Sequence, residues 1–114
     1  MATGVENLLA FKKSFELAGL IYDVSKGFPK EERYSLTDQV RRSSRAVCAN
    51  ISEAYAKRRY EAHFINKLSD ADMENTETQT WLLFALSCGY IDPELNKQLQ
   101  DLSEETGRLL EYMI

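Results

Sequence analysis

Residues that break helices and form turns are scarce in this chain. Only two prolines and five glycines occur among its 114 residues. An all-β fold changes strand roughly every 8–12 residues and marks most of those changes with such residues. The scarcity therefore excludes an all-β fold and favours a few long helices.

Cysteine and histidine are also scarce, with only Cys48, Cys88 and His63 present. Two thiols and one imidazole make a poor ligand set for a metal ion, and nothing in the sequence indicates the oxidising compartment that a disulfide needs. We expect both cysteines to be small buried hydrophobic residues and assign no role to His63. The sequence therefore predicts no metal site and no cofactor.

No catalytic motif is present either. The one cluster of carboxylates with a suggestive spacing consists of Asp70, Asp72, Glu74 and Glu77. The Glu-x-x-His pattern of di-iron helical bundles is missing from it, so a solvated face or a contact between subunits is the favoured interpretation. We assign no catalytic residue and expect the protein not to be an enzyme.

Long apolar runs are missing as well. No run approaches the roughly 20 residues that span a bilayer, and the N-terminal segment is too short and too polar for a signal peptide. With 44% hydrophobic and 28% charged residues, the composition is typical of a globular protein. We therefore expect one cytoplasmic domain over residues 1–114 that has no membrane partner.

Apolar residues recur at three- and four-residue steps in four segments, which predicts four amphipathic helices. They cover residues 5–26, 36–57 and 60–88, and a fourth begins after Asp92 and continues to residue 114. Asp92 followed by proline and glutamate is a strong helix start, and Gly89 is a natural helix stop. Ser35 with Asp38 resembles a capping box. The short connections favour an all-α, antiparallel up-down-up-down four-helix bundle.

The apolar surface of these helices is larger than one bundle core needs. The first helix carries a second apolar stripe that includes Leu17 and Ile21, and Trp81 and Phe84 lie off the main stripe of the third helix. Excess apolar surface commonly marks a self-association site. We therefore predict that these four residues form an oligomer interface; the alternative is that they extend a wide core.

Three polar residues lie on the apolar stripes, namely Asn50, Asn75 and Thr78. A buried polar group without a partner costs about 1–3 kcal/mol, so each of them needs a hydrogen bond. Our hypothesis for Asn50 is a bond to a neighbouring helix that fixes the register of packing. All three are predicted to be structural polar positions.

The formal net charge of −4 is unevenly distributed. Residues 41–67 carry seven basic and two acidic groups, a net of +5, whereas residues 68–114 carry ten acidic and two basic groups, a net of −8. Such a chain can offer a basic surface to a polyanion. The candidate nucleic-acid-binding residues are Arg41, Arg42, Arg45, Lys57, Arg58 and Arg59. Alternatively, these side chains pair with carboxylates of helices three and four, within or between subunits.

Within this set Arg58 and Arg59 are the stronger candidates for nucleic-acid contact. They lie beside Tyr55 and Tyr60, whose rings could stack on unpaired bases. The alternative role of the cluster at residues 57–59 is structural, because basic side chains complement the partial negative charge at the end of a helix.

Several stretches of the sequence resemble a known bacterial family. Residues 28–36 read FPKEERYSL, and they are followed by QVRRSS at 39–44, ANISEA at 49–54 and GYI at 89–91. This order resembles the four-helix bundle family of proteins encoded in intervening sequences of 23S rRNA genes. It is more distantly similar to the accessory variability protein of diversity-generating retroelements. Arg42, Asn50, Ile51 and Glu53 match the family motif.

The resemblance implies a homopentamer of four-helix bundles without enzymatic activity. In the retroelement branch it also implies a basic surface that binds nucleic acid and a reverse transcriptase. We therefore expect a homo-oligomeric scaffold that binds RNA or DNA through the basic surface of its second helix, with a nucleic-acid-processing protein such as a reverse transcriptase as a further partner. The alternative is a structural adaptor that binds only protein.

Overall fold

The computed structural model describes residues 4–114, and within that range it contains helices and no strand. The elements, in chain order, are the 3-10 helix η1 (Val5–Asn7), α1 (Leu9–Ser25), the 3-10 helix η2 (Lys30–Glu32), α2 (Leu36–Ala56), α3 (Glu61–Ser87) and α4 (Pro93–Met113). The prediction of an all-α chain with four main helices is confirmed. Residues 1–3 of the predicted domain lie outside the described residues.

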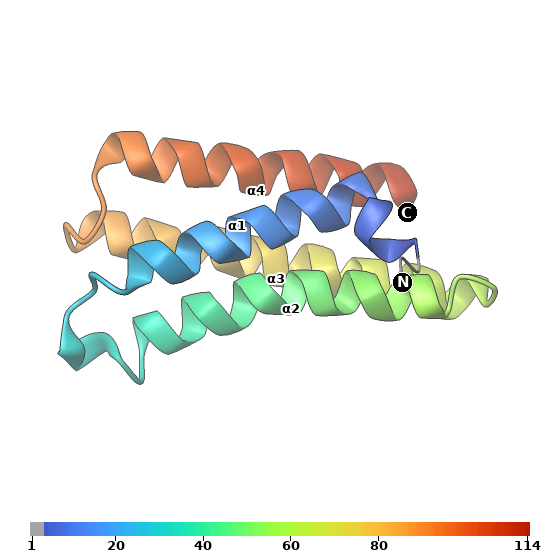
Figure 1. The fold of residues 1–114 in the computed structure, drawn as a ribbon, viewed down its shortest axis with the longest axis horizontal. Coiled ribbons are helices and arrows are strands. Elements are labelled where there is room, and N and C mark those ends of the chain that lie inside the picture. The colour runs from blue at the N-terminus through green and yellow to red at the C-terminus, as the bar shows by residue number, and fades with distance from the viewer. Residues whose placement is uncertain (1–3) are drawn as a thin grey trace.

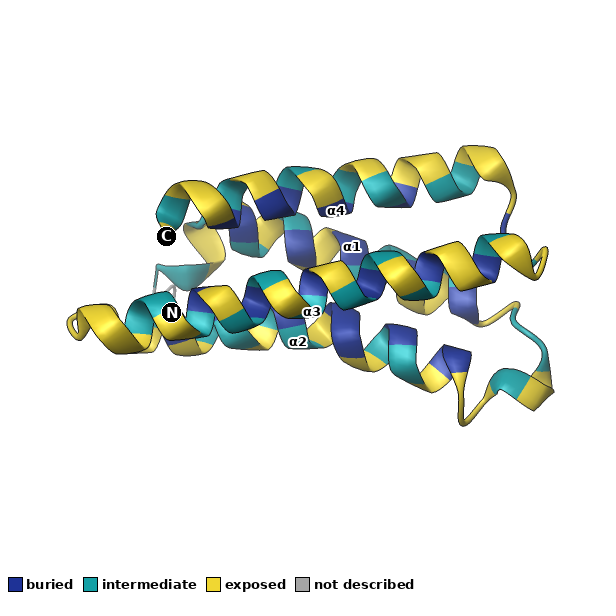
Figure 2. Cartoon of the chain, turned by 180° about the vertical axis from the view of Figure 1, so that it is seen from behind, coloured by how far each residue is buried: buried dark blue, intermediate teal, exposed yellow. Residues whose placement is uncertain are grey.

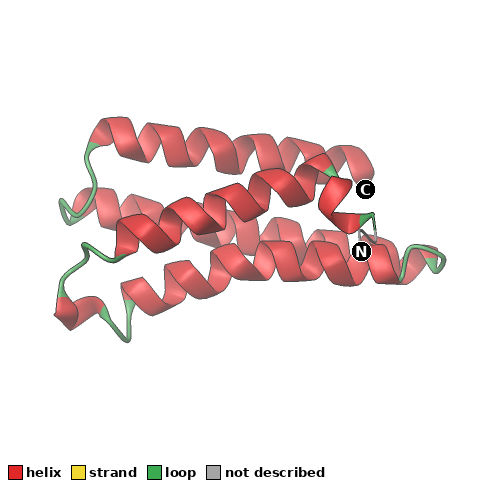
Figure 3. Ribbon diagram, in the orientation of Figure 1, coloured by secondary structure: helices red, strands yellow, loops and turns green. Residues whose placement is uncertain are grey.

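The four α-helices lie side by side along the long axis of the molecule (Figure 1), which measures 44 Å against 26 and 24 Å for the other two axes. α1 contacts α2 and α4, and α3 contacts the same two helices. Each helix therefore has two helical neighbours, as at the corners of a square. The connections between the helices are short (Figure 3), and the labelled N and C ends lie at one end of the molecule.

Two connections meet at the other end of the molecule. The ring of Phe28, which follows α1, lies 5.4 Å from the ring of Tyr90, which follows α3. The Tyr90 hydroxyl also donates a hydrogen bond of 2.9 Å to Glu32 Oε2. These contacts join the segment before α2 to the segment before α4.

The ends of the helices follow local sequence signals at two of the three predicted places. Asp92 Oδ1 accepts a hydrogen bond of 2.7 Å from the backbone N–H of Leu95, and Gly89 adopts a φ of 78° just after α3. α2 begins at Leu36 as predicted, but the capping box of Ser35 with Asp38 is wrong. Glu32 replaces it, because the η2 turn brings its carboxylate within 3.3 Å of the Leu36 N–H.

The first predicted helix, residues 5–26, is interrupted near its start. η1 ends at Asn7, Leu8 is extended with ψ 130°, and α1 begins only at Leu9. Both Val5 and Leu8 contact the apolar cluster at this end of the bundle.

The core consists of two apolar clusters with a polar layer between them. Buried residues lie on the sides of the helices that face one another (Figure 2). The first cluster contains Leu17, Ile21, Leu36, Val40, Leu82, Ala85, Ile91 and Leu99. The second contains Ala10, Val47, Ile51, Ala54, Leu68, Ala71 and Leu110. On every helix a buried polar residue separates the two, and this polar layer consists of Ser14, Ser43, Ser44, Asn75, Thr78, Ser103 and Thr106.

Leu17 and Ile21 therefore do not form an oligomer interface, and that prediction is wrong. Their exposed fractions are 1% and 2%, and both belong to the first cluster of the core. The second apolar stripe of helix one is explained by its two helical neighbours, α2 and α4, which cover different sides of the helix. This stripe of α1 is therefore buried within the subunit.

The polar layer joins the helices through hydrogen bonds. Asn75 Nδ2 donates to the Ser103 carbonyl at 2.9 Å, and Ser103 Oγ donates to Asn75 Oδ1 at 2.8 Å. Thr78 Oγ1 donates to Ser43 Oγ at 2.8 Å. Among the described residues, every fully buried side-chain nitrogen or oxygen has a partner. Asn75 and Thr78 thus link α3 to α4 and to α2.

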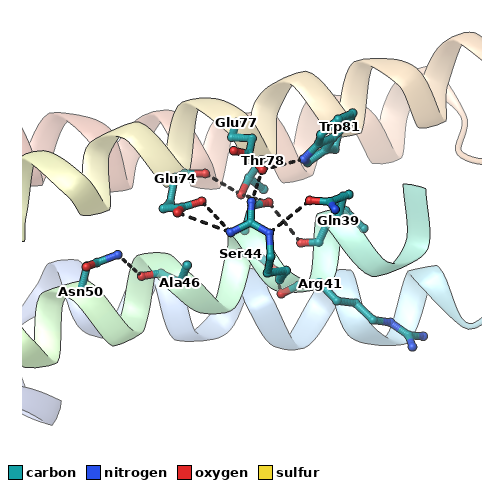
Figure 4. Close-up of polar contacts among 12 residues, drawn as sticks. Gln39, Arg41, Ser44, Ala46, Asn50, Glu74, Glu77, Thr78 and Trp81 are labelled. Carbon is teal, nitrogen blue, oxygen red and sulfur yellow. Dashed lines mark hydrogen bonds and ion pairs between the residues drawn. The ribbon is translucent and has the colours of Figure 1, made fainter. Parts of the chain in front are cut away.

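Asn50 behaves differently, and the hypothesis that it bonds to a neighbouring helix is wrong. Its Nδ2 donates to the Ala46 carbonyl, one turn earlier in α2, at 2.9 Å (Figure 4). Asn50 is only half-buried, because the adjacent Ile51 occupies the inward-facing position with an exposed fraction of 0%. The polar layer, by contrast, supplies side-chain hydrogen bonds between helices.

Candidate nucleic-acid interface

The six predicted basic residues do not form one surface. Arg41, Arg42 and Arg45 lie in the first half of α2, whereas residues 57–59 follow its last turn. Twelve residues separate Arg45 from Lys57, which corresponds to about 18 Å along a helix. The basic residues of the first half also point to different sides, because successive side chains rotate by about 100° around a helix.

Arg42 is used within the subunit. Its Nη1 lies 3.3 Å from Glu74 Oε1, its Nη2 contacts Glu77 Oε2, and its Nε donates to Gln39 at 3.1 Å. Figure 4 shows both glutamates reaching from α3 toward α2. Burial opposes the charge on Arg42, but the two carboxylates outweigh it and raise the pKa of the guanidinium. Arg42 therefore joins α2 to α3 and is not part of the candidate interface.

Arg41 and Arg45 lie on the opposite flank of α2, next to α1. Their guanidinium carbons are 4.6 and 5.2 Å from the centroid of the Tyr22 ring. Arg41 Nε also donates to Ser25 Oγ at 2.7 Å. Within residues 4–114 neither guanidinium is paired with a carboxylate, so both keep an uncompensated positive charge at the surface between the two helices.

The remaining three cations lie together in the turn between α2 and α3. We call Lys57, Arg58, Arg59 and Tyr60 the α2–α3 tip. Lys57 Nζ is 5.8 Å from the centroid of the Tyr60 ring, and 61% of Tyr60 is exposed. His63 contacts the same ring edge-on at 6.3 Å. The tip therefore presents an exposed aromatic ring among positive charges.

Arg58 and Arg59 have different environments within the tip. Arg58 Nη1 donates to the Tyr55 carbonyl at 2.8 Å, and its guanidinium lies 4.1 Å from the Tyr55 ring centroid. This contact satisfies a carbonyl at the end of α2, which is the structural role expected for a basic residue there. Arg59 is exposed and has no hydrogen bond or ion pair among the described residues. Lys57 and Arg59 are consequently the cations that a ligand could use.

Neither of the nearby carboxylates, Glu53 and Glu61, forms an ion pair with the tip among the described residues. Glu53, one turn before Lys57, is 3.0 Å from Lys67 Nζ of α3 and is therefore already paired. The tip can offer two cations without an ion pair to phosphates and the ring of Tyr60 to an unpaired base, because base stacking requires only a free aromatic face. Stacking and phosphate contact are the two interactions that single-stranded nucleic acids use.

Of the residues predicted for an oligomer interface, Phe84 is the most exposed, at 53%. Trp81 is half-buried, packs against the first cluster and donates from Nε1 to Glu77 at 3.0 Å (Figure 4). The sequence interpretation missed Phe15 and Met73, which are 64% and 66% exposed. The sequence contained a signal for the exposure of Met73, because this residue lies off the main apolar stripe of α3.

The cysteines differ from their prediction. Cys48 is half-buried beside Ser14, with Sγ 3.2 Å from Ser14 Oγ, and burial raises the pKa of its thiol. Cys88 is exposed at the end of α3, so the expectation that it is buried is wrong. Cys88 is the residue that directly follows the last turn of α3. Among residues 4–114 no three metal-ligating side chains lie together.

Comparison with known proteins identifies the family. A family model described as 23S rRNA-intervening sequence protein matches residues 6–112. The chain belongs to this family. A crystal structure of a family relative supports the same conclusion: a protein of unknown function from the S23 ribosomal protein family of Bacteroides thetaiotaomicron is 32% identical, with 96% of each chain covered and a TM-score of 0.85. No match was found among curated proteins.

Membership of the 23S rRNA-intervening sequence protein family confirms the resemblance inferred from residues 28–54 and 89–91. The similarity extends to the whole fold, because the relative is covered almost end to end. No helix that the structure describes has the length and apolar character needed to cross a bilayer.

Proposed function

We propose that this member of the 23S rRNA-intervening sequence protein family is a non-enzymatic, homo-oligomeric scaffold that binds RNA or DNA at its α2–α3 tip. The observation that carries the proposal is the grouping of Lys57, Arg59 and the exposed ring of Tyr60 in one turn. Arg58 supports the tip from within by holding the end of α2. The candidate interface is therefore smaller than the sequence suggested and lies at one end of the bundle.

We also propose that the helices are connected as an antiparallel up-down-up-down bundle. The contact of Phe28 with Tyr90 supports this topology, since it brings the connections after α1 and after α3 to the same end. Every α2–α3 tip would then lie at the opposite end from those connections. In a ring of parallel subunits, all tips would share one face.

A homopentamer is our proposed assembly, and it explains how a small tip could bind usefully. Two free cations and one ring make a weak site in a single subunit. Linking several weak sites raises the effective concentration of each after the first has bound, which can increase the total affinity by about 10²–10⁴-fold. The family resemblance further supports a nucleic-acid-processing protein such as a reverse transcriptase as a partner.

A salt titration tests nucleic-acid binding directly. Fluorescence anisotropy of a labelled single-stranded RNA should rise with protein concentration, and the affinity should fall as salt increases. Each phosphate contact adds about 0.7 to the salt slope for a single strand. The variant Lys57→Ala with Arg59→Ala should therefore lose about 1.4 units of slope per engaged subunit. Arg58 is kept, because its loss would disturb the end of α2.

The matched control removes the same charge elsewhere. Lys97→Ala with Arg108→Ala takes two exposed cations from α4, so the net charge of the two double variants is identical. The control should bind like the unaltered protein. If both double variants lost the same affinity, the loss would result from net charge and not from the tip. If the unaltered protein bound no RNA at low salt, the protein-binding adaptor would be the better function.

A further inference from the structure

A shallow apolar groove of about 500 Å³ lies between α1 and α2 on the outside of the bundle. We call it the α1–α2 groove, and its lining includes Phe15, Gly19, Tyr22, Arg45, Ala49 and Ser52. Two of its aromatic side chains are poorly covered, since Phe15 is 64% and Tyr22 38% exposed. Nothing in the described part of the chain fills it.

Gly19 is the most informative residue of the groove. Glycine destabilises the interior of a helix relative to alanine, and it is normally kept where another group approaches closely. A Cβ atom built on Gly19 would meet no atom within 4 Å, so packing inside the subunit does not require a glycine there. Its missing side chain keeps the groove open, together with the small side chains of Ala49 and Ser52 opposite.

The charge at one end of the groove is also unmatched. Arg41 and Arg45 share the ring of Tyr22 and have no carboxylate partner in the described range. By contrast Arg42, on the other flank of α2, is paired with two glutamates. An occupant of the groove should therefore carry an acidic group at this end.

The same chain carries exposed apolar side chains and an unpaired carboxylate on another helix. On the outward side of α3, Met73, Leu83 and Phe84 are 66%, 54% and 53% exposed, and we call these three residues the α3 ridge. Asp70, one turn before Met73, has no hydrogen bond or ion pair among residues 4–114. The exposed residues Thr76 and Thr80 lie between Met73 and Phe84 on this side of α3, so the ridge offers apolar contacts at its two ends. The free carboxylate near Met73 is complementary in charge to the free guanidinium groups at the Tyr22 end of the groove.

The two surfaces also agree in length. The groove extends along α1 from Phe11 to Tyr22, and the ridge extends along α3 from Met73 to Phe84. Both intervals are eleven residues, which is about 16 Å at the helical rise of 1.5 Å per residue. A helix that carries the ridge can therefore place an apolar side chain near each end of the groove.

We propose that the α1–α2 groove receives the α3 ridge of a second copy of this chain, with Asp70 of that copy beside Arg45. The proposal rests on the self-association proposed above and specifies the surfaces that produce it. Because groove and ridge are different parts of the chain, the contact is head-to-tail. Each added subunit leaves one free groove and one free ridge, and such an interface closes into a ring or extends as a filament.

Two blocked variants and their mixture test the pairing. Gly19→Trp fills the groove, and Met73→Glu with Phe84→Glu charges the ridge; all three positions are exposed, so each variant should keep its helical circular dichroism and a cooperative thermal transition. Light scattering on a size-exclusion column should give each variant alone the subunit mass of 13.1 kDa. An equal mixture should form a dimer of about 26 kDa, twice that mass, because one groove and one ridge remain intact. Gln98→Trp, on the outer face of α4, is the matched control and should keep the assembly of the unaltered protein.

The possible failures separate the two proposals. If the unaltered protein is a monomer at tens of micromolar, self-association is absent and both proposals fall. If it is an oligomer that both blocked variants retain, the groove and ridge are not its interface, while self-association stands. If both variants are monomers that do not combine, the surfaces do not bind each other.

A charge exchange tests the pair at the end of the groove without relying on bulky side chains. Arg45→Asp or Asp70→Arg alone should weaken the assembly at least tenfold at low salt, because each places like charges together. The double variant should recover most of that loss. No recovery would overturn the pairing of Arg45 with Asp70.

Discussion

The polar layer makes a stability prediction that can be worked out from its contacts. Asn75 is 2% exposed and makes two hydrogen bonds with Ser103 of α4, at 2.9 and 2.8 Å. The substitution Asn75→Ala removes both bonds and leaves the Ser103 hydroxyl without an acceptor. Gln79 cannot replace it, because its Nε2 is itself a donor to Ser103 Oγ at 2.9 Å.

The expected cost has two parts. A buried donor without an acceptor costs about 1–3 kcal/mol, and the void left by the truncated side chain adds about 1 kcal/mol. We therefore expect Asn75→Ala to lower the free energy of unfolding by about 2–4 kcal/mol. For a domain of this size the midpoint of thermal unfolding should fall by about 8–20 °C.

Urea unfolding at a fixed protein concentration provides the measurement. A fixed concentration is needed because self-association would stabilise the folded subunit by mass action. The midpoint should decrease while the slope with urea stays the same, as expected when only stability changes. Asn66→Ala is the matched control on the exposed side of α3 and should shift the free energy by less than about 0.5 kcal/mol.

Replacing both partners isolates the cause. In Asn75→Leu with Ser103→Ala the orphaned Ser103 hydroxyl is gone, and apolar groups that replace both members of a buried bond can be nearly neutral. Gln79 Nε2 also loses its bond to Ser103, but Gln79 is only half-buried. The double variant should therefore be more stable than Asn75→Ala alone. If Asn75→Ala matched Asn66→Ala, or if the double variant were the less stable one, the polar layer would not stabilise the bundle in the way described.

Two further predictions concern neighbouring groups. A Cβ at Gly107 would lie 3.3 Å from Asn75 Nδ2, whereas alanine favours a helix interior over glycine by about 1 kcal/mol. Gly107→Ala should therefore raise the midpoint of urea unfolding more in Asn75→Ala, where the crowding is relieved, than in the unaltered chain. The hydrogen bond to Glu32 is the largest of the causes that raise the pKa of Tyr90 to about 12. The contribution of this hydrogen bond to the stability of the fold should be complete below the ordinary tyrosine pKa of about 10 and lost as the pH rises to about 12. In Glu32→Gln the pKa of Tyr90, measured by ultraviolet absorbance, should move back toward 10. An unchanged titration would contradict the hydrogen bond as the cause.

Local signals in the sequence predicted the helices well. The start of α4 depends on Asp92 and the residues directly after it, and the end of α3 depends on Gly89. Such signals act within one turn, so neighbouring residues are enough to recognise them. The capping of α2 shows the limit, because the carboxylate that caps Leu36 comes from Glu32 in a separate 3-10 turn.

The candidate site was predicted less well, for a spatial reason. The sequence places Arg42 in a basic segment, but its partner Glu74 is 32 residues further along the chain. The net charge of a segment does not indicate which of its charges face a carboxylate on another helix. In the structure Lys57 and Arg59 have no ion pair, whereas Arg42 is paired with glutamates of α3 and does not belong to the candidate interface.

The sequence by itself determined that the chain forms four helices, where most of them begin and end, and which family it belongs to, because periodicity, capping residues and motifs are local properties. Only the tertiary structure decided which apolar stripes are covered. Leu17 and Phe15 lie two positions apart on α1, yet one is in the core and the other is 64% exposed. Periodicity shows that a face is apolar, whereas the positions of the neighbouring helices decide how much of that face remains open to a partner.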